Sequence, residues 1–205
     1  MSGRLVVAIT GASGALYALR FIKAVLELGL HLDVVVTDYG HRLLIEECGL
    51  NLKTTGLAAW LDERYGAAER RGAVRLYREQ DLDAPIASGS QSWDAMVVVP
   101  CSMKTLSGIA AGRSSNLVER AADVTLKERR PLVLVPRETP LNLIHLENMA
   151  RAVRAGAHVV PAMPAFYHAP ASFEDLADFI AGRVLSLIGL RHDLVPPWGG
   201  REPGP

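Results

Sequence analysis

The chain has 205 residues, of which 49% are hydrophobic and 21% are charged, and its 22 basic side chains balance 22 acidic ones. This length fits one large domain, and zero net charge argues against a protein that coats nucleic acid, because phosphate contacts require an excess of Lys and Arg on one face. The two cysteines provide no disulfide framework or metal-ligand spacing, and no apolar segment reaches the roughly 20 residues that span a bilayer, so we expect a cytoplasmic protein with no nucleic-acid or membrane partner.

The first element is an apolar run, Leu5 to Ile9, that stops at the turn Thr10-Gly11-Ala12-Ser13-Gly14 and leads into a helical pattern over residues 16–26. A strand, a small-residue turn and a helix in this order can form a phosphate site. The free N–H groups of the first helical turn point at the ligand, and the helix dipole favours negative charge. The motif therefore predicts a phosphorylated ligand without naming it, and a tight turn with no ligand is the competing interpretation.

Apolar runs alternate with helical patterns along the rest of the chain. Further strands are expected at residues 32–37, 73–77, 94–100, 131–136 and 158–161, and helices at 40–48, 54–72, 117–129, 146–155 and 173–190. The alternation predicts an α/β fold with a three-layer, doubly wound parallel sheet of the Rossmann or flavodoxin-like type. We expect residues 1–190 to form a single domain and residues 191–205 to form an extended C-terminal tail.

Polar residues follow the strands where each one ends. Besides the first turn, they occur at Thr37, in Pro100-Cys101-Ser102-Met103-Lys104-Thr105 and in Pro136-Arg137-Glu138-Thr139-Pro140. In open parallel sheets this edge is where ligands bind. Ser102, Lys104 and Thr105 could hold a second phosphate or the polar edge of a ring, and Arg137 could pair with an anion. Lys104 could equally be a solvated lysine.

Five sequence blocks carry a resemblance to a known family. They are TGASGALYALR (residues 10–20), ASGS (87–90), PCSMKTLSGIAAG (100–112), ERAADVTLKERRPLVLVPRETPLNLIHLENM (119–149) and PAFYHAP (164–170). The chain resembles the UbiX-type flavin prenyltransferases, part of a wider family of FMN-binding, flavodoxin-like proteins that includes cysteine decarboxylases. The resemblance covers about residues 4–198. Its central block is the most specific part, because no generic nucleotide fold requires that sequence.

The resemblance implies an enzyme, a metal-independent prenyltransferase. Such proteins take reduced FMN and dimethylallyl phosphate and make prenylated FMN, the cofactor of UbiD-type decarboxylases. Positive charge can develop on the allylic carbon as phosphate leaves, and an electron-rich flavin stacked on that carbon both stabilises it and attacks it. Family members tend to form dodecamers with the site at a subunit junction, so a large homo-oligomer is expected.

The resemblance also implies residue roles. Glu47 and Glu138 match acids near the reacting flavin, with Ser13 placed to join their proton relay, and neighbouring Glu46 could hold the role of Glu47. Expected FMN contacts are Gly11, Ala12, Ser13, Thr37, Ser102, Met103, Lys104, Thr105 and Arg137. Expected contacts to the donor phosphate are Tyr167, Arg183, Arg120, Lys127, Arg137, Ser88 and Gly89, of which Arg120 and Lys127 would also act catalytically on the leaving phosphate.

Plainer interpretations compete with these roles. Arg120 and Lys127, seven residues apart, could line one solvated helix stripe. Tyr167 could be a core or interface aromatic, and Arg183 could extend over an apolar surface to reach water. Cys101 is expected to be a buried filler rather than a nucleophile.

Two other functions stay open for the whole chain. One is an FMN-dependent decarboxylase of the cysteine type, although those enzymes carry a PASANT-like segment where this chain has PCSMKT at residues 100–105. The other is a non-catalytic flavin carrier for a decarboxylase, which would bind FMN without turnover.

Overall fold

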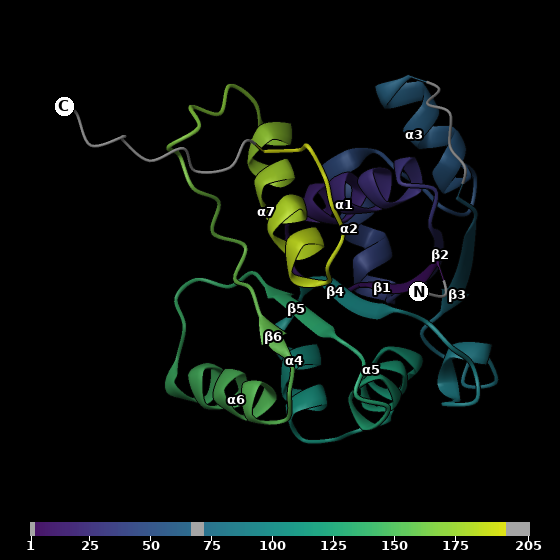
Figure 1. The fold of residues 1–205 in the computed structure, drawn as a ribbon, viewed down its shortest axis with the longest axis vertical. Coiled ribbons are helices and arrows are strands. Elements are labelled where there is room, and N and C mark those ends of the chain that lie inside the picture. The colour runs from purple at the N-terminus through teal and green to yellow at the C-terminus, as the bar shows by residue number, and fades with distance from the viewer. Residues whose placement is uncertain (1–2, 67–71, 196–205) are drawn as a thin grey trace.

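The computed structural model describes residues 3–66 and 72–195, and six parallel strands form its central sheet (Figure 1). The strand order is β3-β2-β1-β4-β5-β6, the doubly wound order of Rossmann sheets. The expected fold class is therefore confirmed. The strands are β1 Arg4–Ile9, β2 His31–Val36, β3 Val74–Arg78, β4 Ala95–Cys101, β5 Leu132–Pro136 and β6 His158–Val159.

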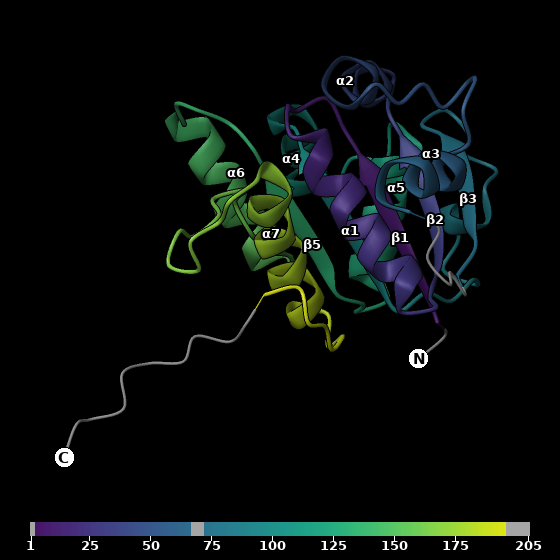
Figure 2. The same ribbon diagram turned by 90° about the horizontal axis from the view of Figure 1, so that it is seen from above.

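Helices cover both faces of the sheet, giving three layers (Figures 1 and 2). One face carries α1 (Ala15–Glu27), α2 (Asp38–Cys48), α3 (Leu57–Tyr65) and α7 (Phe173–Leu187), whose buried side chains share one hydrophobic cluster. The other face carries η1 (Pro85–Ala87), α4 (Met103–Ala110), α5 (Leu117–Lys127) and α6 (Leu143–Arg154), which share a second cluster. No helix in the described part of the chain combines the length and hydrophobicity that crossing a membrane requires.

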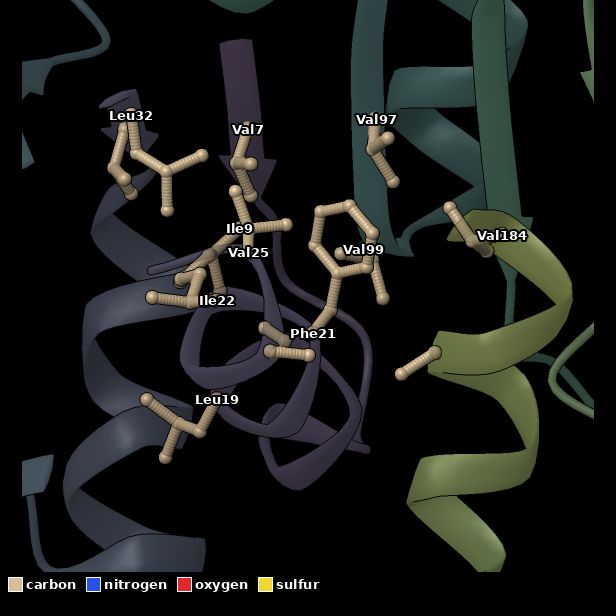
Figure 3. Packing of buried hydrophobic residues seen from close by; sticks show 14 of the residues in the cluster. Val7, Ile9, Leu19, Phe21, Ile22, Val25, Leu32, Val97, Val99 and Val184 are labelled. Atoms are coloured by element: carbon tan, nitrogen blue, oxygen red, sulfur yellow. The ribbon is translucent and has the colours of Figure 1, made fainter. Parts of the chain in front are cut away.

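The sheet core follows from the twofold alternation of strand side chains. In β1, Val7 and Ile9 face the α1 side while Val6 and Ala8 face the α5 side, and all four are at most 1% exposed. Figure 3 shows Phe21 of α1 packed among side chains from the strands and from α7. The uninterrupted apolar runs are therefore explained by burial on both faces.

Several boundaries differ from the expectations. Helix α4 is not among the expected helices, and Ser102 caps it by accepting the Thr105 N–H at 3.2 Å. The expected helix at 54–72 is shorter in the structure: α3 starts at Leu57 and ends at Tyr65, and residues 67–71 lie outside the described residues. Helix α6 begins three residues early, at a capping box formed by Asn142 and His145.

The C-terminal prediction is tested only in part. Helix α7 starts at Phe173, where the sequence predicted a helix to begin, and Ser172 and Asp175 form the capping box there. Beyond α7, residues 191–195 form no helix or strand, and the His192 ring lies against Gly182 with Nε2 3.0 Å from Ser186 Oγ. The rest of the expected tail, residues 196–205, lies outside the described residues.

Candidate active site

The turns after β1 and β4 meet at the point where the strand order reverses, and Thr10 joins them. Its Oγ1 donates to the Pro100 carbonyl and accepts the Ser102 N–H, each at 2.8 Å. Thr10 is 1% exposed, so both bonds are shielded from water. Because doubly wound sheets bind ligands at this switch point, Thr10 fixes the floor of the candidate site. Sequence reasoning placed Thr10 only at the end of a strand.

A cavity of about 320 Å³ opens above this floor. Seven predicted site residues line it: Gly11, Ala12, Ser13, Ser102, Met103, Arg137 and Glu138. The remaining wall comes from α2, through Tyr39, Arg42, Leu43 and Glu46. Sequence reasoning missed the first three of these. Arg42, Leu43 and Glu46 follow Tyr39 by three, four and seven residues, so the four side chains lie on one face of α2. This helical period is the signal that could have identified them.

The first turn can approach α2 because of its glycines. A Cβ on Gly11 would lie 2.6 Å from the Tyr39 Cβ, which is closer than carbon atoms pack. Gly14, the N-cap of α1, has φ 116°, which side chains rarely adopt. Arg137 Nε donates to the Ser13 carbonyl at 2.9 Å. The turn after β5 therefore holds the turn after β1, and the Arg137 guanidinium lies at the cavity wall.

Two neighbouring acids on α2 have different surroundings. Glu47 Oε2 accepts the N–H groups of Gly14 and Ala15, each at 2.8 Å, and so occupies the N-terminus of α1. Glu46 pairs with Arg42 at 2.7 Å on the cavity wall. These two N–H groups are therefore already bonded to a carboxylate of the chain, and the phosphate site expected at the turn stays a prediction. The proposed catalytic role of Glu47 stays a prediction.

The hydroxyl residues Thr37, Ser102 and Thr105 serve the starts of helices. Thr37 Oγ1 accepts the Gly40 N–H at 3.1 Å as the N-cap of α2. Ser102 Oγ lies 3.0 Å from Thr105 Oγ1 at the start of α4. Thr37 and Thr105 are each 8% exposed, whereas Lys104 is exposed; none of these three lines the cavity. Their expected contacts with FMN stay predictions.

Apart from Arg137 at the cavity wall, the residues expected at the donor phosphate form two separate groups. In the first, Arg120 Nε donates to the Ala87 carbonyl at 2.9 Å, and a Cβ on Gly89 would collide with Lys127 Nζ. The loop after η1, which contains Ser88, therefore lies along α5. Arg120 is partly neutralised by Asp123 at 3.2 Å. The structure therefore brings the ASGS loop beside these two cations, and their contact with a donor phosphate stays a prediction.

The second group lies on the opposite side of the sheet (Figures 1 and 2). Tyr167 is 53% exposed, and its ring meets that of Phe179 on α7 edge-on, with centroids 6.0 Å apart. Arg183 is exposed on the same helix. Lys127 ends α5 close to where β5 begins, at the edge of the sheet opposite the cavity. One chain therefore does not bring Tyr167, Lys127 and the cavity together around one phosphate.

A larger cavity of about 810 Å³ lies between α1, α2, α3 and the start of α7. Arg20, Arg64, Glu63 and Glu174 line it, together with Trp60 and Tyr65. None of the turns at the carboxyl ends of the strands reaches it. We therefore assign the chemistry to the smaller cavity, where those turns converge.

The cysteines are poor nucleophiles. Cys101 is fully buried, and burial raises the pKa of its thiol, so the expectation of a buried filler is confirmed. Burial, with a smaller contribution from Glu47, raises the pKa of the half-buried Cys48 to about 11. Among residues 3–66 and 72–195, no three His, Cys, Asp or Glu side chains group as metal ligands would.

Sequence comparison identifies the family of the chain. The flavoprotein family model matches residues 2–185. A flavin prenyltransferase UbiX from Halalkalibacterium halodurans is 46% identical over 197 residues, covering 96% of this chain and 94% of the relative. The chain belongs to the UbiX flavin prenyltransferase family. The expected family is thereby confirmed.

Two solved structures of UbiX relatives share the fold. AnUbiX (PadA1), whose crystal structure is in complex with FMN and dimethylallyl pyrophosphate, matches with a TM-score of 0.85 at 40% identity. The match covers 97% of this chain and 98% of AnUbiX. A dodecameric FMN-dependent UbiX-like decarboxylase from Escherichia coli O157:H7 has a TM-score of 0.83 at 40% identity, with 96% of this chain and 100% of that chain covered.

Proposed function

We propose that this chain is a flavin prenyltransferase. It transfers the dimethylallyl group of dimethylallyl phosphate to reduced FMN, and the prenylated FMN serves a UbiD-type decarboxylase. The observation that carries the proposal is the near full-length similarity to a structure holding both FMN and a dimethylallyl donor. The switch-point cavity, lined by seven of the expected residues, supports it independently.

The cavity suits a flavin nucleotide. Gly11, Ala12 and Ser13 provide a low wall that a flat ring can approach, and Arg137 provides a cation that can pair with a carbonyl or phosphate oxygen. Its volume is at the lower end of the range for small-molecule sites, which suggests that the ligand is only partly enclosed by one chain. Reduced FMN supplies the electron-rich ring that attacks the allylic carbon.

The chain's own residues provide charge and proton transfer. Arg120, Lys127, Arg183 and the Tyr167 hydroxyl bind the donor phosphate and stabilise the charge that develops as it leaves. Glu138 lies on the cavity wall, where its carboxylate accepts the proton released when the fourth ring closes. Ser13, on the facing turn, relays that proton. Glu138 Oε1 already accepts the Thr139 N–H at 2.9 Å, which orients the carboxylate.

The decisive experiment is anaerobic incubation of the protein with reduced FMN and dimethylallyl phosphate, followed by mass spectrometry of the released flavin. We expect a product heavier by one C5H8 unit. Unchanged FMN with both the monophosphate and the pyrophosphate donor would overturn the proposal. A protein that binds FMN but never alters it would then be a carrier.

We also propose a homo-dodecamer whose sites combine residues from different subunits. The dodecameric relative supports the assembly, and the separation of the α5 and α7 groups within one chain supports shared sites. Coexpression of Lys127→Ala with Arg183→Ala tests this. Each variant alone should be inactive, whereas random mixed oligomers should recover about a quarter of the sites, because each of two contributing subunits is intact half the time. No recovery in mixed oligomers would refute shared sites.

The cellular setting belongs to the same proposal. Cys48 and Cys101 are both free thiols, as suits the reducing cytoplasm. The proposed recipient of the product is a UbiD-type decarboxylase, which uses prenylated FMN as its cofactor. Transfer of prenylated FMN from this protein to an apo-decarboxylase, measured as recovered decarboxylase activity, tests that step.

A further inference from the structure

The C-terminal end of α5 folds three charged side chains onto the turn at Gly89. Lys127 Nζ lies 2.5 Å from Glu128 Oε1, and a Cβ on Gly89 would collide with both atoms. Arg130 Nη2 donates to the Gly89 carbonyl at 3.4 Å, and its guanidinium carbon lies 4.2 Å from the centre of the Trp93 ring. The turn is therefore contacted both by Arg130 and by the Lys127–Glu128 ion pair.

The ion pair matters because Lys127 is one of the cations assigned to the donor phosphate. The Lys127 ammonium, through its hydrogen bond and its charge, lowers the pKa of Glu128, so Glu128 is ionised at neutral pH. In the single chain, the side chains of Lys127 and Glu128 are 47% and 35% exposed. In the free chain the positive charge of Lys127 is thus already balanced by its neighbour.

We propose that Glu128 is a specificity-determining residue of the donor site: it acts as an internal counter-ion that competes with the donor phosphate for Lys127. A phosphate that pairs with Lys127 brings its negative charge next to the Glu128 carboxylate, which must swing away or repel it. A diphosphate carries more negative charge into the same place, so Glu128 disfavours it more strongly than a monophosphate. The inference rests on the proposed function for the identity of the donor.

The test uses inorganic phosphate and pyrophosphate as probes, with binding measured by titration calorimetry on the full-length oligomer. Glu128→Gln should bind phosphate about threefold to fivefold more tightly than the wild type, which is the size of one exposed ion pair. The gain should be larger for pyrophosphate. Lys127→Met should weaken binding, and adding Glu128→Gln to it should restore little. Glu27→Gln is the matched control, because Glu27 pairs with Lys23 at 2.6 Å on α1, away from the site.

Three results would overturn the inference. They are unchanged affinity in Glu128→Gln, an equal gain in the Glu27→Gln control, and a gain that persists without Lys127. Phosphate binding that is undetectable in both wild type and Glu128→Gln would overturn it as well. Because these titrations need no turnover, they are independent of the prenylation assay. A wild type that makes prenylated FMN while Glu128→Gln shows no gain refutes this inference alone, and a wild type that makes none refutes the proposed function.

Discussion

Replacing Glu47 by alanine should destabilise the protein whatever its effect on catalysis. The Glu47 carboxylate accepts two N–H groups, from Gly14 and Ala15, at the start of α1. The N-cap residue, Gly14, has no side chain that could replace it. Glu47 therefore acts as the cap of α1 from another helix, and its removal leaves two helical donors to water.

The size of the effect follows from known caps. Loss of a side-chain cap costs about 0.5–2 kcal/mol, and a carboxylate at a helix N-terminus contributes about 0.3–1 kcal/mol through the dipole. Because Glu47 is exposed, water replaces part of both contributions, and we expect a loss of about 1–2 kcal/mol in total. For a chain of this size that lowers Tm by about 2–8 °C.

Thermal scans at one fixed rate would measure this. Glu47→Gln keeps an acceptor oxygen but loses the charge, so its Tm should lie between those of the wild type and Glu47→Ala. Glu46→Ala is the control, since Glu46 forms only an exposed pair with Arg42 and should shift Tm by less than about 2 °C. The reasoning fails if Glu47→Ala melts with the wild type or shifts no more than Glu46→Ala.

Three further predictions concern separate parts of the molecule. The Asp178 carboxylate accepts from Arg20 Nε at 2.6 Å and from Nη2 at 2.5 Å, and the Arg20 side chain is only 13% exposed. Asp178→Asn should therefore lower the free energy of unfolding, measured by heat or urea, by about 1.5–3 kcal/mol. A loss below about 0.5 kcal/mol would contradict this. The rate of Cys48 alkylation by iodoacetamide should rise about tenfold per pH unit from about pH 8 to 10, because the thiolate fraction rises in that proportion below a pKa of about 11. A rate that stops rising below about pH 9 would argue against the raised pKa. Glu138→Gln should retain flavin in equilibrium dialysis but prenylate it about 10²–10⁴-fold more slowly, and an unimpaired rate would exclude Glu138 as the proton acceptor.

The strands were predictable because their physical cause is local in the sequence. Continuous Val-rich runs such as 94–100 and 131–136, bounded by turn signals, are typical of strands buried on both faces, and the structure buries both. Helix α4 was missed because its cap, Ser102, also belongs to the turn after β4, and the turn was the stronger signal. The seven cavity residues were predictable because parallel strands bring their carboxyl ends to one edge.

The donor residues show where sequence reasoning stops. Similarity in PAFYHAP and in ERAADVTLK predicts that their residues share one donor site, but it does not predict which copies of the chain contribute them. The structure places the residues of these two blocks on opposite faces of the sheet, and a six-stranded sheet separates them. If both blocks contact one phosphate, as proposed, the site must combine residues from more than one chain, and the arrangement of those chains is not readable from one sequence.

Glu46 and Glu47 show the opposite case, in which the helical period separates the positions of two neighbouring acids, while the catalytic role of Glu47 stays a prediction. Adjacent residues of a helix point about 100° apart, so both acids cannot share a wall. Glu46 continues the stripe of Tyr39, Arg42 and Leu43 and therefore faces the cavity. Glu47 is turned toward α1 and accepts its first N–H groups. If Glu47 also takes part in the reaction, it does so from the N-terminus of α1. Substitution of Glu47 should then reduce both the stability and the reaction rate. Substitution of Glu46 should change flavin binding alone.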